Sequence, residues 1–396
     1  LQFATDGYSL VNGTAGALNL VNGGTGNAAI RVDPNNTATI GVAINGAGTL
    51  GKYDTGTLVL NGTNGYTGGT ALNGGKLVVG NDSALGTGVL TTANGTALDS
   101  NTAVNLANAV VLNGTLNVAG SNALTLGGVV SGSGSMVKSG AASLTLNGNN
   151  TYSGGTQLAA GTLVLGNNNA LGSGTLGVTG NAVLDSTAAL QLNNAINLGA
   201  QLALTGTQDT VLGGVISGTA SLVKNGTGAL LLTGANTYSG GTTLNGGATT
   251  GDTSSLQGAI ANNATLTFEQ AADGTYTGNL TGAGVLNKNG TGDLLLSGNN
   301  AFTGDTNVNA GGLLVNGTLN SANVLVGSGA SLGGSGQLAG TVTLASGSTL
   351  TAGTGVTPLS VGGLNLSSGT NLDFSLGAPG AATSVVNVAG NLTLDG

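Results

Sequence analysis

Short runs in which Leu or Val alternates with small polar residues follow one another along the chain. Examples are "TGTLVLNG" (55–62) and "ASLTLNG" (142–148), and Gly and Asn bound each run. Alternation with a period of two is typical of β-strands that bury one face, while Gly and Asn favour tight turns. No run has the length and the 3.6-residue period of an amphipathic helix. The pattern predicts an all-β protein.

The runs recur at a long interval that a lysine marks most clearly. Lys52, Lys138 and Lys224 follow one another at an 86-residue interval, and Lys288 follows Lys224 at a 64-residue interval. Apolar residues keep the same spacing: Leu50, Met136, Leu222 and Leu286 stand two positions before each lysine, and the pairs Leu58/Leu60, Leu144/Leu146, Leu230/Leu232 and Leu294/Leu296 follow it. Because one residue separates the members of each pair, we expect both side chains to face the interior.

The last interval is shorter than the others by roughly 22 residues, which indicates that one structural unit is missing between the third and fourth copies. Four units of about 21–22 residues account for the longer interval, and three account for the shorter one. In a solenoid each coil contacts only its neighbours, so a whole coil can be lost without disturbing the rest. The spacing therefore predicts a parallel β-helix (solenoid) of about 18 coils of roughly 21–22 residues.

A heptapeptide follows each Leu pair. It reads "NTYSGGT" at 150–156 and at 236–242, "NGYTGGT" at 64–70 and "NAFTGDT" at 300–306. Asn and Gly favour tight or left-handed turns, so we expect the heptapeptide to form a corner of the coil. Since the fourth copy has Phe302 in place of Tyr, we expect the ring to serve in packing and not in chemistry. The terminal Thr leads into a strand that ends in Leu158 or Leu244.

The whole unit can be read at 131–166 as "SGSGSMVKSGAASLTLNGNNTYSGGTQLAAGTLVLG". It resembles the passenger-associated transport repeat, also called the autotransporter-associated β-strand repeat, of type V secreted proteins of Gram-negative bacteria. Four copies are recognisable, near 43–80, 131–166, 218–247 and 280–317. The first two close with "GGKLVVG" (74–80) and "AGTLVLG" (160–166), whereas the third has "NGGATTGD" (245–252). We therefore expect a less regular coil in the third copy.

The resemblance implies a passenger that crosses the outer membrane through its own C-terminal β-barrel and folds outside as a right-handed parallel β-helix. Residues 1–317 would be the β-helix with the four copies. Residues 318–396 would be further coils of the same continuous solenoid, ahead of a translocator barrel that is absent from this sequence. The resemblance also implies that the repeats aid secretion. Most such passengers are adhesins, self-associating proteins or surface scaffolds.

Composition narrows the possible chemistry. The chain has no Cys and no His, which excludes disulfides, thiolate metal sites and histidine-based acid–base catalysis. The net charge is −8 with only six Lys and Arg, so we expect no nucleic-acid partner. The mean hydropathy of +0.28 argues against disorder. No apolar run is long enough for a membrane-spanning helix. Because the segment that starts at Leu1 lacks a basic stretch followed by an apolar one, we expect no signal peptide there.

Candidate chemical sites are few. A Ser–Lys pair would have to use lysines that mark a repeat position, so we expect these lysines to serve structure or solubility. Glu269 and Asp273, near Phe268 and Tyr276, form the nearest grouping of acids, the groups that carbohydrate-cleaving β-helix enzymes use. We expect them to lie in a solvated loop. "GGTGNA" (23–28) and "GGSGQL" (333–338) lack the Asp of a calcium-binding β-roll. We therefore expect no catalytic residue, metal or cofactor.

The expected surface is long, nearly uncharged and rich in Thr, Ser and Asn. Hydroxyls and amides can hydrogen-bond to sugars or to an identical rod, and such weak contacts gain strength when many copies act together. We therefore predict a non-enzymatic adhesin, self-association module or surface spacer at a bacterial surface or secreted, with identical rods or surface glycans as partners. Two alternatives stay open: a carbohydrate-cleaving β-helix enzyme, and repeats that act only as a secretion aid.

Overall fold

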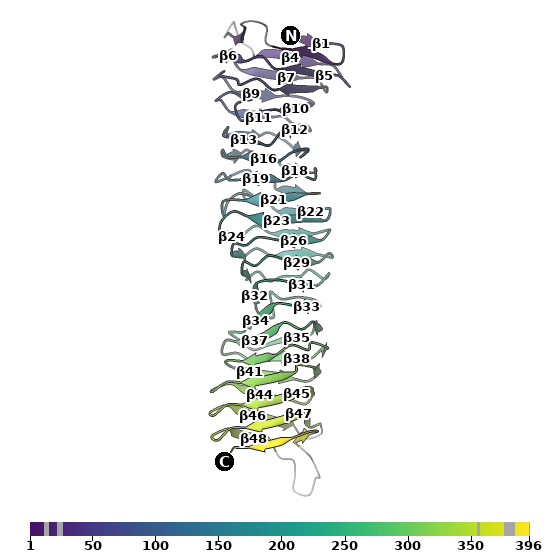
Figure 1. Ribbon diagram of the computed structural model, residues 1–396, viewed down its shortest axis with the longest axis vertical. Coiled ribbons are helices and arrows are strands. Elements are labelled where there is room, and N and C mark those ends of the chain that lie inside the picture. Colours follow the sequence, from purple (N-terminus) through teal and green to yellow (C-terminus); the bar gives the residue numbers. More distant parts are fainter. Residues whose placement is uncertain (12–15, 22–26, 355–356, 376–384, 396) are drawn as a thin grey trace. The chain divides into compact units, whose positions relative to one another are not determined.

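A computed structural model describes residues 1–396 except 12–15, 22–26, 355–356, 376–384 and 396, so most of the "GGTGNA" stretch lies outside the described residues. The described residues form short β-strands and no helix, as predicted (Figure 1). Adjacent strands come from successive turns of the chain and run parallel. The fold is therefore a β-solenoid, with about 17 turns where 18 were predicted. The chain divides into two compact units, residues 1–203 and residues 204–396.

The first unit contains four sheets. Sheet A comprises β1 (Gln2–Phe3), β4 (Ala28–Val32), β7 (Leu50–Tyr53), β9 (Thr70–Leu72), β11 (Leu90–Thr92), β14 (Val110–Leu112) and β17 (Val130–Ser131). Sheet B comprises β2 (Tyr8–Leu10), β5 (Thr37–Ile40), β8 (Thr57–Leu60), β10 (Lys76–Val79), β12 (Thr96–Ser100), β15 (Leu116–Val118), β18 (Met136–Lys138), β20 (Thr156–Leu158), β22 (Leu176–Val178) and β25 (Ile196–Leu198). Sheet C comprises β3 (Leu18–Leu20) and β6 (Ile44–Gly46). Sheet D comprises β13 (Val104–Leu106), β16 (Leu124–Leu126), β19 (Leu144–Leu146), β21 (Thr162–Leu165) and β23 (Ala182–Ser186), and the unit ends with β24 (Leu190–Leu192) and β26 (Leu202–Leu204).

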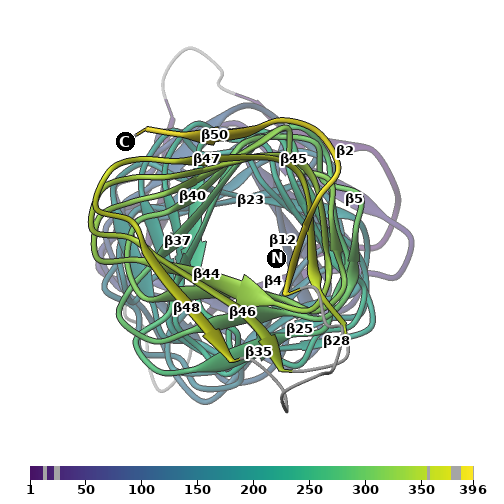
Figure 2. The ribbon, with the colours of Figure 1, turned by 90° about the horizontal axis from the view of Figure 1, so that it is seen from below.

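The second unit contains three sheets. Sheet E comprises β27 (Thr210–Leu212), β30 (Leu230–Leu232), β32 (Ala248–Gly251), β34 (Thr265–Glu269), β37 (Val285–Asn289), β39 (Asn299–Asn300), β40 (Thr306–Val308), β42 (Thr318–Leu319), β43 (Asn323–Val326), β45 (Gln337–Leu344), β47 (Leu359–Leu366), β49 (Val386–Val388) and β50 (Leu392–Leu394). Sheet F comprises β35 (Gly274–Tyr276), β38 (Leu294–Leu296), β41 (Gly312–Val315), β44 (Ser331–Gly334), β46 (Thr349–Thr354) and β48 (Asn371–Ser375). Sheet G comprises β29 (Leu222–Lys224), β31 (Thr242–Leu244), β33 (Ile260–Asn262) and β36 (Leu280–Thr281), and β28 (Ile216–Gly218) precedes it. Figure 2 shows β44, β46 and β48 on one side of the coil and β45, β47 and β50 on another.

Stacked aliphatic side chains form the core of both units. The predicted Leu pairs and the apolar residues before each lysine are all buried, with at most 1% of each side chain exposed. In sheet D, Leu124, Leu144 and Leu163 occupy one register position, and Leu126, Leu146 and Leu165 occupy the next inward one. Each buried Leu contributes about 1.5–3 kcal/mol of transfer free energy. The interior assignment is confirmed.

From β7 onward most coils of the first unit are shorter than the predicted 21–22 residues, whereas the turns before β7 are not, since Ala28 pairs in register with Leu50 and Gln2 with Arg31. From β7 to β17 of sheet A, the consecutive register partners are Leu50, Thr70, Leu90, Val110 and Val130, so each of these coils spans 20 residues. The hydrogen bonds that Asn64 and Asn150 accept from the preceding coil join residues with the same separation. The prediction failed because it assumed that the 86-residue interval is a whole number of coils. Lys52 lies in β7 of sheet A, and the next strand along the chain, β8, belongs to sheet B. Lys138 also lies in sheet B, in β18, four coils beyond β8. The 86-residue interval therefore consists of four whole coils plus the move from one face of the coil, formed by one sheet, to the next face.

The second unit repeats this step with one coil fewer. Lys224 lies in β29 of sheet G and Lys288 in β37 of sheet E, three coils beyond β30, the strand after β29. The shorter interval is thus three coils and one face, which agrees with the predicted loss of one coil. Within each unit, successive copies of the repeat face different sides. No single flat partner can therefore contact equivalent residues of neighbouring copies.

The third copy keeps its strand, although its sequence predicts an irregular coil. In strand β32, Thr249 pairs in register with Leu230 of β30 and with Leu266 of β34, so both coils are shorter than those of sheet A. Thr249 stands where the other copies have Leu77, Leu163 and Leu313, and it is 1% exposed. Its Oγ1 is the buried side-chain polar atom that lacks a hydrogen-bond partner among the described residues. The irregularity therefore lies in coil length and core chemistry, not in strand pairing.

Thr249→Val is expected to stabilise the protein. The two side chains have nearly the same shape, and the substitution removes a buried hydroxyl that has lost its water without gaining a partner. We expect the free energy of unfolding to rise by about 1 kcal/mol, measured by urea unfolding followed by circular dichroism. Thr250→Val, at the neighbouring half-buried position, is the control and should change stability by less. Equal stabilisation by both variants would contradict the role of the unpaired hydroxyl.

Candidate functional site

The heptapeptide takes the place of a strand, which is a larger role than the corner predicted from the sequence. In the first copy the heptapeptide lies one coil after β6 of sheet C, on the same face. The next strand on that face is β13, two coils after the heptapeptide, where sheet D begins. The Asn64 side chain bridges this gap: its Oδ1 accepts from Ile44 N at 2.8 Å, and its Nδ2 donates to Ala84 O at 2.6 Å. One amide thus joins the coil before the heptapeptide to the coil after it. Buried backbone groups that would otherwise lack a partner are satisfied.

The same bridge recurs in the later copies. Asn150 accepts from Val130 N and donates to Ala170 O, both at 2.7 Å. Asn236 accepts from Ile216 N at 2.7 Å and donates to Ser255 O at 2.8 Å. In the fourth copy Asn300 still accepts from Leu280 N at 2.9 Å. In the first three copies a buried asparagine therefore joins the coils on either side of the heptapeptide. In the fourth copy Asn300 lies in β39, and its Nδ2 donates within its own coil, to Gly298 O at 3.2 Å.

The aromatic residue of each heptapeptide is buried beneath this bridge. Tyr66, Tyr152 and Tyr238 are at most 1% exposed, and each hydroxyl hydrogen-bonds to the Thr four positions later, at 2.6, 2.5 and 2.7 Å. Burial raises the pKa of Tyr66 and of Tyr152 to about 12. In the fourth copy Phe302 fills the same space, and Thr306 bonds instead to Ser321 at 2.6 Å. The ring packs, as predicted, and its hydroxyl satisfies a buried threonine.

The four repeat lysines are also buried, a placement that the local sequence pattern does not predict. Lys52, Lys138, Lys224 and Lys288 are at most 3% exposed. Lys288 Nζ donates to the carbonyls of Asn289, Gly290 and Ala310 at 2.8, 2.9 and 2.9 Å. Every copy uses the carbonyl two positions after the lysine and the one 22 residues after it, on the next coil. The ammonium therefore joins two coils through backbone oxygens.

Glycine gives the lysine its space. The residue after the distant carbonyl is Gly75, Gly161, Gly247 or Gly311, with φ between 63° and 73°. A Cβ on Gly161 would lie 2.8 Å from Lys138 Nζ, and one on Gly311 would lie 2.9 Å from Lys288 Nζ. A local reading of the sequence could not find this cage, because half of it comes from a turn one coil away. The signal that was available is the fixed spacing between each lysine and this glycine.

Burial lowers the pKa of all four lysines, and that of Lys52 falls to about 8 even though Asp54 opposes the shift. An unfolded lysine keeps its proton up to about pH 10.4. Between pH 8 and 10 the unfolded chain therefore binds more protons than the folded chain, so the free energy of unfolding should rise. Above pH 10 the tyrosines of the unfolded chain lose their protons before the buried tyrosines of the folded chain do. The free energy of unfolding should then fall.

We expect the resulting stability maximum near pH 10, measured by urea unfolding between pH 7 and 11. Lys52→Met should reduce the rise between pH 8 and 10 and leave the fall above pH 10 unchanged. A free energy of unfolding that decreases steadily from pH 8 would contradict the role assigned to the lysines.

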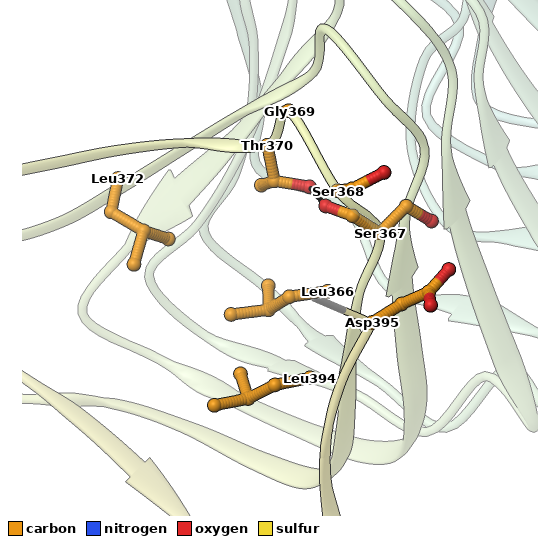
Figure 3. A pocket seen from close by; sticks show the side chains of 8 residues that line it. All are labelled: Leu366, Ser367, Ser368, Gly369, Thr370, Leu372, Leu394 and Asp395. Carbon is orange, nitrogen blue, oxygen red and sulfur yellow. Dashed lines mark hydrogen bonds between the residues drawn. The ribbon is translucent and has the colours of Figure 1, made fainter.

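The acidic pair considered for catalysis lies on the surface. Glu269 and Asp273 are exposed, whereas Phe268 and Tyr276 are buried and meet edge to face, with ring centroids 5.3 Å apart. Asp273 Oδ1 accepts from Asp293 N at 2.9 Å, so it holds the neighbouring coil. A pocket lies elsewhere in the second unit, between β47, β48 and β50, where Leu366, Leu372, Leu394 and Asp395 line it (Figure 3). One carboxylate beside leucines provides no acid–base pair.

Exposed charge differs between the units. In the first unit, Arg31 pairs with Asp54 at 3.0 Å and Lys76 with Asp99 at 2.6 Å. In the second unit both lysines, Lys224 and Lys288, are buried. Its eight acidic residues, none of them buried, are Asp209, Asp252, Glu269, Asp273, Asp293, Asp305, Asp373 and Asp395. The described surface of the second unit thus presents carboxylates, amides and hydroxyls but no ammonium or guanidinium group.

Comparison with known proteins identifies the repeated unit. The family model of the passenger-associated-transport-repeat matches residues 50–79, 136–165, 222–249 and 286–315. The chain is also similar to the adhesin BmaC autotransporter of Brucella suis biovar 1 (strain 1330), with 40% identity over 173 residues. That alignment covers 41% of this chain and 5% of the relative, so the chain spans a small part of the relative's length. No solved structure matches the chain. The resemblance predicted from the motif is confirmed.

Proposed function

The chain is a β-solenoid that carries four passenger-associated-transport-repeats, and from this we propose that it is a non-enzymatic, adhesive segment of an autotransporter passenger. Such a segment is displayed at or released from the bacterial surface, after passage through an outer-membrane barrel of the complete protein. The similarity to an autotransporter adhesin supports this proposal. In this function the outward residues of the coils provide the binding surface, and the buried residues of the repeats provide stability.

The observation that carries the proposal is that the recurring residues of each repeat are buried and structural, while other residues face outward. Its recurring lysine, tyrosine and asparagine are all buried and occupied with backbone carbonyls, a threonine or backbone amides. None of them is free to act on a substrate. The outward positions differ between copies, as at Gln157, Thr243 and Asn307, which are polar and not buried. Recognition therefore belongs to the outward residues.

Adhesion can be tested with beads that carry the purified 396-residue chain at a measured density. Beads that bind host cells or each other more strongly than beads carrying a matched inert protein would support the proposal. Because the second unit presents carboxylates without a counter-charge, binding between identical chains should strengthen when salt screens their repulsion. Beads that bind neither cells nor one another at any salt concentration would overturn the adhesive function.

A role of the repeats in secretion alone makes a different prediction. A variant that lacks one 86-residue interval, residues 53–138, keeps the repeat pattern at the new junction. If the chain serves adhesion, this variant should lose adhesion per exported molecule. If the repeats only aid secretion, the amount exported should fall and adhesion per molecule should stay constant. Counting surface molecules and bound cells on the same bacteria separates the two.

A further inference from the structure

The fourth copy keeps the core of the repeat but changes its outward face. Leu286, Lys288 and Val308 face inward in β37 and β40, as Met136, Lys138 and Leu158 do in the second copy. Between them, the outward residues are Asn287 and Asn307, where the second copy has Val137 and Gln157 and the third has Val223 and Thr243. The core residues account for folding in every copy. The amides of Asn287 and Asn307 are therefore particular to the fourth copy, whereas the Asn289–Asn309 pair has a counterpart in Asn225–Asn245 of the third copy.

These amides belong to a hydrogen-bonded patch on sheet E. Three side-chain pairs link adjacent strands: Asn307 Nδ2 donates to Asn287 Oδ1 at 3.0 Å, Asn309 Nδ2 to Asn289 Oδ1 at 2.9 Å, and Asn323 Nδ2 to Asp305 Oδ1 at 2.9 Å. We call the six residues of these pairs the amide patch. Strands β37, β40 and β43 are consecutive in the sheet, and Asn307 is the register partner of both Asn287 and Leu325. The patch thus spans three coils.

The pairing fixes the amides and leaves hydrogen-bonding capacity. A primary amide has two N–H donors and an acceptor oxygen. Asn307, Asn309 and Asn323 each use one donor to hold a neighbour, and Asn309, Asn323 and Asp305 are exposed. Groups that are already held in place lose less conformational entropy when they bind a ligand. Leu325, 48% exposed, adds an apolar surface directly beside Asn307.

We propose that the amide patch binds an uncharged glycan, an inference that rests on the proposed adhesive function and names its ligand class. Sugar hydroxyls donate to and accept from amides, and the C–H face of a sugar ring packs on an apolar side chain such as Leu325. Sulfated, sialylated or uronic-acid glycans are disfavoured because the described surface of this unit has no cationic side chain. Asp305 and the neighbouring Glu269 also repel anions.

Charge argues against a second copy of the chain as the occupant. Two copies that meet through this face would bring Asp305 and Glu269 of each close to those of the other, and like charges across an interface reduce binding. A neutral glycan has no such penalty. Glycan binding at the patch should therefore depend little on salt, whereas association between two copies should strengthen as salt increases.

The test measures binding of the purified 396-residue chain to an array of immobilised neutral, sialylated and sulfated oligosaccharides. The wild-type chain should bind one or more neutral oligosaccharides and none of the anionic ones. Asn307→Ala combined with Asn309→Ala should weaken that binding at least tenfold. The matched control is Thr243→Ala combined with Asn245→Ala in the third copy, where Asn245 also donates to a neighbouring asparagine at 2.8 Å. The control should bind as the wild type does, and both variants should keep the wild-type melting temperature within a few degrees.

The outcomes separate this inference from the proposed function. Binding to anionic oligosaccharides, or neutral binding that both variants keep, would overturn the glycan site. A chain that binds no oligosaccharide but still joins beads to cells or to each other would also overturn it, and the adhesive function would stand. A chain that fails both the array and the bead assay would overturn both. If the patch variant loses its fold, Asn307→Gln provides the second test, since it keeps the amide but moves it.

Discussion

Tyr152→Ala should lower the free energy of unfolding by about 3–5 kcal/mol, the usual cost of removing a buried aromatic ring. The Tyr152 side chain is fully buried at the interruption of sheet A, where no strand is available to fill the space. The ring and the Asn150 bridge together replace that strand. Urea unfolding followed by tyrosine fluorescence and circular dichroism measures the loss, and amide exchange at Thr156–Leu158 locates it.

Tyr152→Phe separates the ring from the hydroxyl. It leaves Thr156 Oγ1 buried without its partner at 2.5 Å, which should cost about 1–2 kcal/mol. Adding Thr156→Val should recover most of this loss, since both polar groups are then gone. The fourth copy supports this expectation: Phe302 is accommodated there because Ser321 takes over the threonine. A loss as large for Tyr152→Phe as for Tyr152→Ala would show that the hydroxyl, not the ring, holds the interruption.

The strands and the core were predictable because they depend on local sequence. Alternation at Leu144, Thr145 and Leu146 is enough to place two side chains inward and one outward, and the structure agrees. The loss of one coil was predictable too, because an interval in the sequence records it directly. These features need no knowledge of what lies on the neighbouring coil.

The lysine cage and the turning of the repeat depend on neighbouring coils, so local patterns did not reveal them. A lysine is usually a surface residue. Lys138 is inside because carbonyls two and 22 residues away accept its hydrogen bonds. The step to the next face follows from the same geometry. Each interruption occupies the face after the Leu-pair strand, two faces beyond its lysine strand, and only the pairing between coils shows this placement.

The stepping geometry makes deletion length decisive for the first unit. Removing residues 116–135, which make up one coil, joins Thr115 to Met136 and places β18 where β15 was, since Leu116 and Met136 are register partners. Asn150 then accepts from Val110 N in place of Val130 N, because these two residues are also register partners. We expect a folded unit with one coil fewer and a melting temperature within a few degrees of the original, as nearest-neighbour stacking requires.

Removing one more residue, 116–136, should be far more damaging. Val137 then takes the position of Leu116, so Val137 and Ser139 face the core and Lys138 faces the solvent. The ammonium loses its carbonyl cage, and the Leu columns above and below lose their continuation. We expect the cooperative thermal transition to disappear and the unit to become sensitive to protease, both compared with the one-coil deletion. If the two deletion variants have the same melting temperature, the turns can absorb a one-residue shift. Coil length would then not determine which side chains of the repeat face the core.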